Sequence, residues 1–172
     1  MISLVKKTIF YLYLSLAFLT PLVFSSNTAE LYEFPKMFFV YFIGTTIAFL
    51  FLILALFGKA QKLKRPPIFV LAYLGFIIVS FLFSSHHYTS LWGYYSRFNG
   101  GLVSYLVFFV LYYVAFNFFD GDKIETLKDV FCLSLVPVSL YGLFQISETA
   151  RIFSTLGQPN WLAAYLLTLI PI

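Results

Sequence analysis

The sequence contains few charged residues. Asp, Glu, Lys and Arg make up 10% of its 172 residues, whereas they make up roughly 25% of an ordinary soluble domain. Hydrophobic residues account for 61% of the chain. A soluble protein of this length could not bury so much apolar surface, because its surface is large relative to its volume. The composition therefore excludes a soluble globular domain and predicts an integral membrane protein in contact with the lipid bilayer.

Cysteine is also scarce, and charge is missing from the apolar segments. Cys132 is the only cysteine, so an intrachain disulfide is excluded. No Asp, Glu, Lys or Arg lies inside an apolar run. Such residues within a membrane usually mark ion pathways or proton relays, and their absence argues against a proton-coupled transporter. The net charge of +4 does not indicate a nucleic-acid partner here, because the charges stand between membrane segments.

Charge-free apolar runs recur along the chain. They cover residues 8–24, 37–57, 67–83, 101–119, 130–147 and 160–172. A helix needs roughly 20 residues to cross the hydrocarbon core, within a range of about 17 to 25, and the first five runs meet this requirement. The sixth run is shorter, and we expect the chain to be the amino-terminal part of a longer protein. The pattern predicts an all-α, polytopic transmembrane helical bundle with six spans, forming one domain over residues 1–172.

The first run admits two interpretations. Lys6 and Lys7 precede it and a serine pair follows it, as in a secretory signal peptide. However, the apolar stretch is long for a signal peptide, contains Pro21, and is followed by five more hydrophobic runs. We therefore predict that the first helix is retained.

The positions of lysine and arginine predict the orientation in the membrane. Positive residues in short loops favour the cytoplasm. With the amino terminus in the cytoplasm, eight of the eleven cations lie in inner segments. The three outer cations are Lys36, Arg97 and Arg151, and the outer loops are 25–36, 84–100 and 148–159.

The outer loop SSHHYTSLWGYYSRFNGG, residues 84–101, carries aromatic residues and one arginine. Trp92, Tyr94 and Tyr95 suit the membrane interface, where a ring keeps one edge apolar and the other wet. Alternatively, these rings form a platform on which sugars stack. Arg97 either snorkels to the interface or has a functional role, since the glycines after it let the backbone bend around it.

His86 and His87 in the same loop do not predict a metal site. Adjacent residues in a loop rarely converge on one ion, and no cysteine or carboxylate stands nearby in the sequence to complete the ligands. We expect the pair to be solvated or to face lipid headgroups, and we expect no metal and no cofactor.

The outer segment ETARIFSTLGQPN, residues 148–160, leads directly into the last apolar run. Gly157 allows a tight turn, and Pro159 suits the first turn of a helix, where its missing N–H is not needed. One interpretation is ordinary punctuation between a loop and a helix. The other is an anion site, because a helix amino terminus offers free N–H groups to a phosphate and Arg151 is close in sequence. Gln158 and Asn160 supply further hydrogen-bonding groups.

The same segment resembles a family signature. Residues 151–163, RIFSTLGQPNWLA, are similar to the pattern of an arginine, a spacer, Gly-[Gln/Asn]-Pro-Asn and Leu-Ala found in the O-antigen ligase and O-antigen polymerase superfamily. This superfamily includes bacterial protein O-oligosaccharyltransferases. Two other stretches are similar to some of its members. They are residues 20–36, with Glu30, Glu33 and Lys36, and residues 91–100, with Trp92 and Arg97.

The resemblance implies a glycosyltransferase of the bacterial inner membrane. Family members transfer a glycan from undecaprenyl pyrophosphate to an acceptor hydroxyl on the periplasmic face, without a metal. Arginines hold the pyrophosphate, and a histidine in a large outer loop of the carboxy-terminal half assists the acceptor. Nothing in this chain matches that loop, so the catalytic histidine is expected outside it. The resemblance assigns substrate binding to Arg97, Arg151, Gln158 and Asn160.

Two other functions remain open at this point. A glycan-lipid transporter would need a path through the membrane and usually buried charges, whereas a non-catalytic membrane scaffold would need no clustered outer arginines. The acceptor also stays open between a glycan, a lipid and a protein.

Overall fold

The computed structural model describes residues 2–57, 63–147 and 151–169, and every named element in them is helical. The α-helices are α1 (Ile2–Leu19), α2 (Glu33–Phe57), α3 (Ile68–Leu82), α4 (His87–Trp92), α5 (Leu102–Phe118), α6 (Gly121–Leu133), α7 (Leu135–Phe144) and α8 (Pro159–Leu169). Two short 3₁₀ turns, η1 (Gln145–Ser147) and η2 (Ser154–Leu156), lie between α7 and α8. The predicted all-α class is confirmed.

Three of these helices are long and apolar enough to cross a membrane: α1, α2 and the continuous helix Gly121–Phe144, which joins α6 and α7 through Ser134. The apolar helices α3 and α5 are shorter, with 15 and 17 residues, and α8 has 11. A multi-pass membrane protein fits these helices by length and composition. Six complete crossings stay a prediction.

Two helices begin and end away from the predicted runs. The first run was expected at 8–24, but α1 covers Ile2–Leu19. Pro21, which lacks the N–H needed to continue the helix, follows closely, and the chain leaves α1 through a turn in which the Leu22 and Val23 N–H groups donate to the Leu19 carbonyl. The run expected at 130–147 forms only the second half of the helix that starts at Gly121. Charged residues end an apolar run, but they do not end a helix.

The start of this helix is fixed by a side-chain cap. Asp120 accepts a hydrogen bond from the Lys123 backbone N–H at 3.0 Å and pairs with the Lys123 ammonium. A carboxylate at this position satisfies one of the free N–H groups of the first turn. Both contacts to Lys123 hold the pKa of Asp120 below its usual range.

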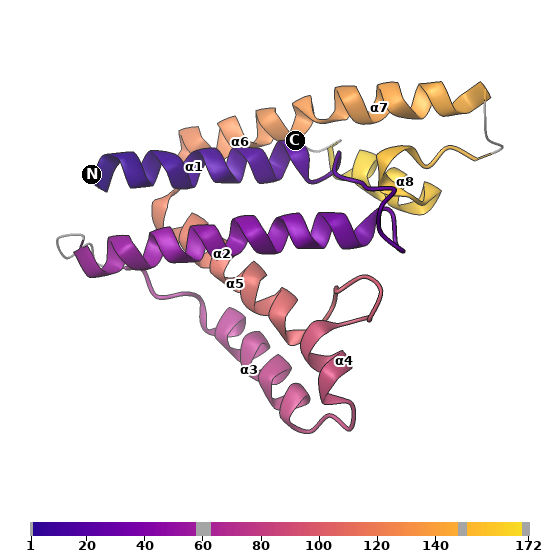
Figure 1. The fold of residues 1–172 in the computed structure, drawn as a ribbon. Helices are drawn as coiled ribbons and strands as arrows, with labels where there is room; N and C mark the ends of the chain where they lie inside the picture. Colours follow the sequence, from indigo (N-terminus) through magenta and orange to yellow (C-terminus); the bar gives the residue numbers. More distant parts are fainter. Residues whose placement is uncertain (1, 58–62, 148–150, 170–172) are drawn as a thin grey trace.

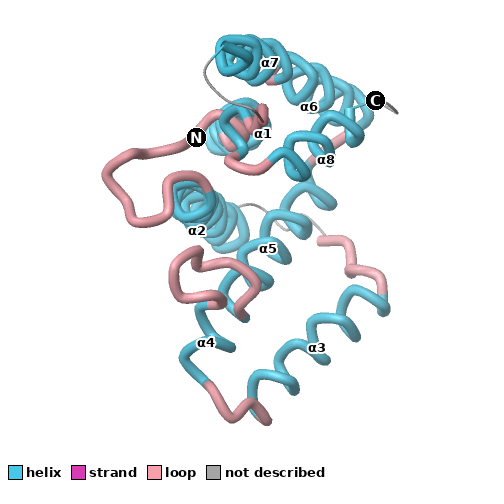
Figure 2. Tube along the Cα trace, turned by 90° about the vertical axis from the view of Figure 1, so that its right-hand side faces the viewer, coloured by secondary structure: helices cyan, strands magenta, loops and turns pink. Residues whose placement is uncertain are grey.

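The packed centre lies between α1, α2 and α5, with α6 on the other side of α1 (Figures 1 and 2). Its buried side chains are Ile9, Tyr13, Ile43, Ile47, Leu54 and Val114. Gly44 lets α2 and α5 approach closely, since a Cβ atom there would lie 2.6 Å from Val107. The Tyr13 hydroxyl donates to the Leu111 carbonyl at 2.6 Å, which satisfies a polar group inside an apolar core.

Large apolar side chains cover the outside of the bundle. α3 has no buried residue, and Phe69 and Phe76 on it are 71% and 76% exposed. Soluble monomers rarely expose contiguous apolar surface of this kind. The exposed phenylalanines are therefore suited to lipid or to other apolar protein surface.

Three connecting segments lie toward the right-hand side of Figure 1, where the turn between α3 and α4 is well below the other two segments. We call residues 20–32, 83–101 and 151–158 together the loop end. They overlap the three loops predicted to face outward (25–36, 84–100 and 148–159), and contacts made by residues in or beside them are described below. Of the predicted loop 148–159, residues 148–150 lie outside the described part of the chain. Which side of a membrane the loop end faces stays a prediction.

Candidate functional site

Residues 93–100 form a closed loop that presents Arg97. Gly93 and Gly100 pair across its base, and both have positive φ angles, +86° and +80°. The Tyr94 N–H donates to the Asn99 carbonyl at 3.1 Å, and the Arg97 N–H donates to the Tyr94 carbonyl at 2.9 Å. Glycine adopts positive φ without steric cost. Of the two glycines after Arg97, Gly100 has the predicted unusual backbone, whereas Gly101 is extended with a φ of −88°.

Tyr41 fastens this loop to the helices. Its hydroxyl donates to the Phe98 carbonyl at 2.5 Å and lies 3.1 Å from the hydroxyl of Ser104, which is fully buried. Tyr41 belongs to α2 and Ser104 to the first turn of α5. Phe98, the residue after Arg97, is therefore tied to α2 through Tyr41, which in turn contacts Ser104 of α5.

The Arg97 side chain meets three groups. Its Nε and Nη1 each lie 3.3 Å from an oxygen of the Glu33 carboxylate. Its guanidinium carbon lies 5.6 Å from the centre of the Tyr94 ring and 5.7 Å from the centre of the Trp161 ring. Arginine stacks well on aromatic faces and binds carboxylates with two parallel N–H groups. The side chain remains 44% exposed, so it is both oriented and accessible.

Trp161 connects Arg97 to the segment 151–163, which resembles the superfamily pattern. It lies in the first turn of α8, which begins at Pro159 as predicted. Its N–H and that of Leu162 both donate to the Gln158 carbonyl at 3.1 Å. The structure thus brings the loop of Arg97 against the helix that follows Gly157, two regions that are far apart in the sequence.

The turn before α8 is built around Gly157 and Ser154. Gly157 has a φ of +81°, and a Cβ atom there would lie 2.4 Å from the ring of Tyr32. Ser154 is buried with a φ of +50°, and its hydroxyl donates to the Val138 carbonyl at 2.6 Å. The Gln145 side-chain oxygen accepts from the Ser154 N–H at 2.8 Å. The tight turn predicted at Gly157 is confirmed.

Lys36 joins two of the three segments of the loop end. Its ammonium donates to the Val23 carbonyl at 2.7 Å and to the Thr155 carbonyl at 2.6 Å. The Thr155 hydroxyl in turn donates to the Pro21 carbonyl at 2.7 Å. The ammonium also lies 5.7 Å from the centre of the Tyr32 ring. Burial, with Tyr141 and Glu30 nearby, raises the pKa of Tyr32, so its ring stays neutral at ordinary pH.

The other predicted site residues are accessible. Arg151, Gln158 and Asn160 are all exposed, the last two at the start of α8. The structure places Arg97 against Trp161, next to Asn160 in sequence. The approach of Arg97 to Arg151 stays a prediction.

The remaining residues of loop 84–101 have mixed surroundings. Tyr94 and Tyr95 are exposed side by side, with ring centres 5.4 Å apart, whereas Trp92 packs against Phe98. His86 precedes α4, and the His87 ring packs against Phe81. Within the described part of the chain, no group of three or more His, Cys, Asp or Glu side chains is arranged to hold a metal ion.

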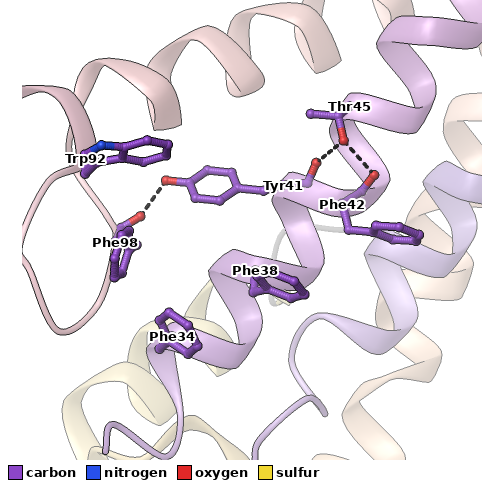
Figure 3. A pocket seen from close by; sticks show the side chains of 7 residues that line it. All are labelled: Phe34, Phe38, Tyr41, Phe42, Thr45, Trp92 and Phe98. Carbon is purple, nitrogen blue, oxygen red and sulfur yellow. Dashed lines mark hydrogen bonds between the residues drawn. The ribbon is translucent and has the colours of Figure 1, made fainter. Parts of the chain in front are cut away.

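An apolar cavity of about 400 Å³ lies beside this site (Figure 3). It is lined by Phe34, Phe38, Tyr41, Phe42, Thr45, Trp92 and Phe98. Phe34 directly follows Glu33, and Phe98 directly follows Arg97. The charged pair and the cavity are therefore neighbours, and together they offer a cation next to an apolar recess.

Two important members of the site were not identified from the sequence. Glu33 and Lys36 were seen only as parts of a stretch similar to the family, and Lys36 also as an outer cation. A signal was present, because Glu30, Glu33 and Lys36 follow one another at intervals of three residues, directly before a long apolar helix. Such spacing is typical of one face of a helix, although in the structure Glu33 and Lys36 lie in α2, whereas Glu30 precedes it and accepts from the Phe34 N–H.

Comparisons with protein-family models, with curated proteins and with solved structures found no match to this chain.

Proposed function

We propose that the protein transfers a glycan from an undecaprenyl-pyrophosphate-linked donor to an acceptor hydroxyl on the outer face of the bacterial cytoplasmic membrane. The proposal rests on the surroundings of Arg97. Its guanidinium is oriented by two aromatic rings, binds a carboxylate, stays partly exposed, and adjoins an apolar cavity. A ligand that suits both the guanidinium and the apolar cavity is an anion attached to a long apolar chain.

The chemistry of transfer needs a cation at this place. The acceptor hydroxyl oxygen forms a bond to the anomeric carbon of the donor sugar, and the bond from that carbon to the pyrophosphate oxygen breaks. The hydroxyl proton passes to a base, and undecaprenyl pyrophosphate leaves with the bonding electrons. Negative charge grows on the leaving oxygen, and a fixed cation in a poorly solvated site stabilises it. Arg97 would supply this cation, with Arg151 as a second one.

The other parts of the site have matching roles in this proposal. The cavity lined by Phe34, Phe38 and Phe42 would take the isoprene units nearest the pyrophosphate. The exposed rings of Tyr94 and Tyr95 would stack against the sugars of the donor. Gln158 and Asn160, exposed at the start of α8, would donate hydrogen bonds to the phosphate oxygens.

Transfer activity of Arg97 variants tests the proposal. In the complete protein in membranes, normalised to correctly inserted protein, Arg97→Ala should lower glycan transfer at least about 100-fold, because a charge-assisted contact to the leaving group is worth a few kcal/mol. Arg97→Lys should restore part of the activity, since a point charge cannot bind two oxygens in a planar fork. Near-normal transfer by Arg97→Ala would refute the role of this residue. A residue that merely snorkels would tolerate lysine fully.

A further inference from the structure

The guanidinium that we assign to the donor pyrophosphate already binds a carboxylate of the same chain. Glu33 lies in the first turn of α2, and its side chain is only 16% exposed. Both of its oxygens face Arg97, at 3.3 Å from Nε and from Nη1. Charge-assisted hydrogen bonds of this type are usually about 2.7–2.9 Å long. Both carboxylate oxygens therefore have a partner on Arg97, but both contacts are longer than usual.

We infer that Glu33 and the pyrophosphate exchange on Arg97 during each catalytic cycle. The donor displaces the carboxylate when it binds, and the carboxylate returns to Arg97 to help expel undecaprenyl pyrophosphate after transfer. Glu33 is thus a residue that sets the affinity of the site and the rate of product release. This inference rests on the proposed function.

The need for such a residue follows from the reaction. The product keeps both phosphates of the donor, so it binds Arg97 at least as strongly as the substrate did. An interaction that holds substrate and product alike slows turnover once product release is limiting. A carboxylate close to the site competes for the same N–H groups and repels the bound anion, and both effects favour release.

Two features of the structure make the exchange physically feasible. Arg97 does not depend on Glu33 for its place, because Tyr94 and Trp161 contact its guanidinium and Tyr41 fixes the adjoining backbone. The side chain is also 44% exposed, so an incoming phosphate reaches it without unfolding the loop.

Binding of a short prenyl pyrophosphate distinguishes exchange from a merely structural ion pair. The probe is farnesyl pyrophosphate, titrated into the complete purified protein in detergent by calorimetry. Glu33→Gln keeps the shape of the side chain but removes its charge, and we expect it to bind the probe about three- to tenfold more tightly than the unmodified protein. Damage to the fold would not increase affinity. Glu30→Gln is the matched control, since Glu30 caps α2 by accepting from the Phe34 N–H at 2.8 Å, which glutamine also can do; its affinity should be unchanged.

Arg97→Ala separates the failure of this inference from the failure of the proposed function. One outcome is that Arg97→Ala fails to bind the probe while Glu33→Gln binds it no more tightly than the unmodified protein. That result would mean that Arg97 holds the anion but that Glu33 does not compete with the anion for Arg97. If Arg97→Ala binds normally, the proposed function and the exchange fail together. Glycan transfer gives a second readout. Glu33→Gln should lower KM and kcat together, whereas loss of a positioning contact would raise KM.

Discussion

At the scale of single residues, Gly157 shows how closely the turn before α8 is packed. Its φ of +81° and the 2.4 Å from an added Cβ atom to Tyr32 both oppose any larger side chain. We expect Gly157→Ala to destabilise the protein by about 2 kcal/mol or more, from backbone strain and overpacking. Thermal unfolding in detergent measures the loss. Gly75→Ala on α3 is the control, because nothing lies within 4 Å of a Cβ there. An equal loss in both variants would mean that the turn at Gly157 is not constrained.

Lys36 is a second residue whose contribution follows from its hydrogen bonds. Replacing it with methionine leaves the Val23 and Thr155 carbonyls without their donor, and we expect a loss of about 1–3 kcal/mol in unfolding free energy. Lys128→Met is the comparison, because that lysine forms an exposed pair with Glu125, and its replacement should cost at most about 0.5 kcal/mol. Equal thermal stabilities for the two variants would show that Lys36 does not hold the loop end together.

At the scale of helices, α1 contributes side chains to the apolar centre of the bundle. Ile9 is 1% exposed and belongs to the apolar centre, whereas Leu4, one turn earlier, is 67% exposed. Ile9→Ala should therefore cost about 2–4 kcal/mol, because it leaves a cavity between helices. Leu4→Ala should cost little. Thermal unfolding of the two variants in detergent tests the difference.

The alternative of a cleaved signal peptide has its own test. The amino terminus of the purified protein, determined by mass spectrometry, should still include residues 2–19. Cleavage after the serine pair at 25–26 would remove α1 and contradict the prediction that the first helix is retained.

The helical class could be predicted from the sequence, but the helix ends could not. Apolar runs mark where a helix can meet lipid, and α3 and α5 coincide with their runs to within one residue at each end. The helix from Gly121 begins earlier than its run, since Asp120 caps it and its first turns tolerate charge. Hydropathy reports the environment of side chains, whereas helix ends depend on caps and prolines.

The site was only partly predictable for a related reason. Arg97 stood out because outer cations are rare, and the glycine-containing turns could be inferred from local rules. Its partner Glu33 lies 64 residues away in the sequence, and Thr155, whose carbonyl accepts from Lys36, lies 119 residues from that lysine. Such contacts depend on how the helices pack, which no local pattern specifies.

At the scale of the whole molecule, one arrangement unites the site and the predicted orientation. Lys36 and Arg97 make their contacts at the loop end, whereas most of the cations belong to the segments predicted to be cytoplasmic. Since positive loops favour the cytoplasm, the loop end should face outward. We expect single cysteines at Asn27, Tyr95 or Ile152 to react with an impermeant thiol reagent in intact cells. Those at Leu63 or Asp122 should react only after the membrane is permeabilised.

The experiment needs a background without the native thiol, so Cys132→Ala is introduced first. All five test positions are exposed in the structure and none carries a lysine or arginine, so the substitutions keep the charge distribution that sets orientation. Labelling at Leu63 in intact cells would invert the topology and place Arg97 in the cytoplasm, away from any outward-facing donor. Labelling at Asn27 and Tyr95 but not at Ile152 would separate α8 from the loop of Arg97, and would contradict the contact between Arg97 and Trp161 on which the site depends.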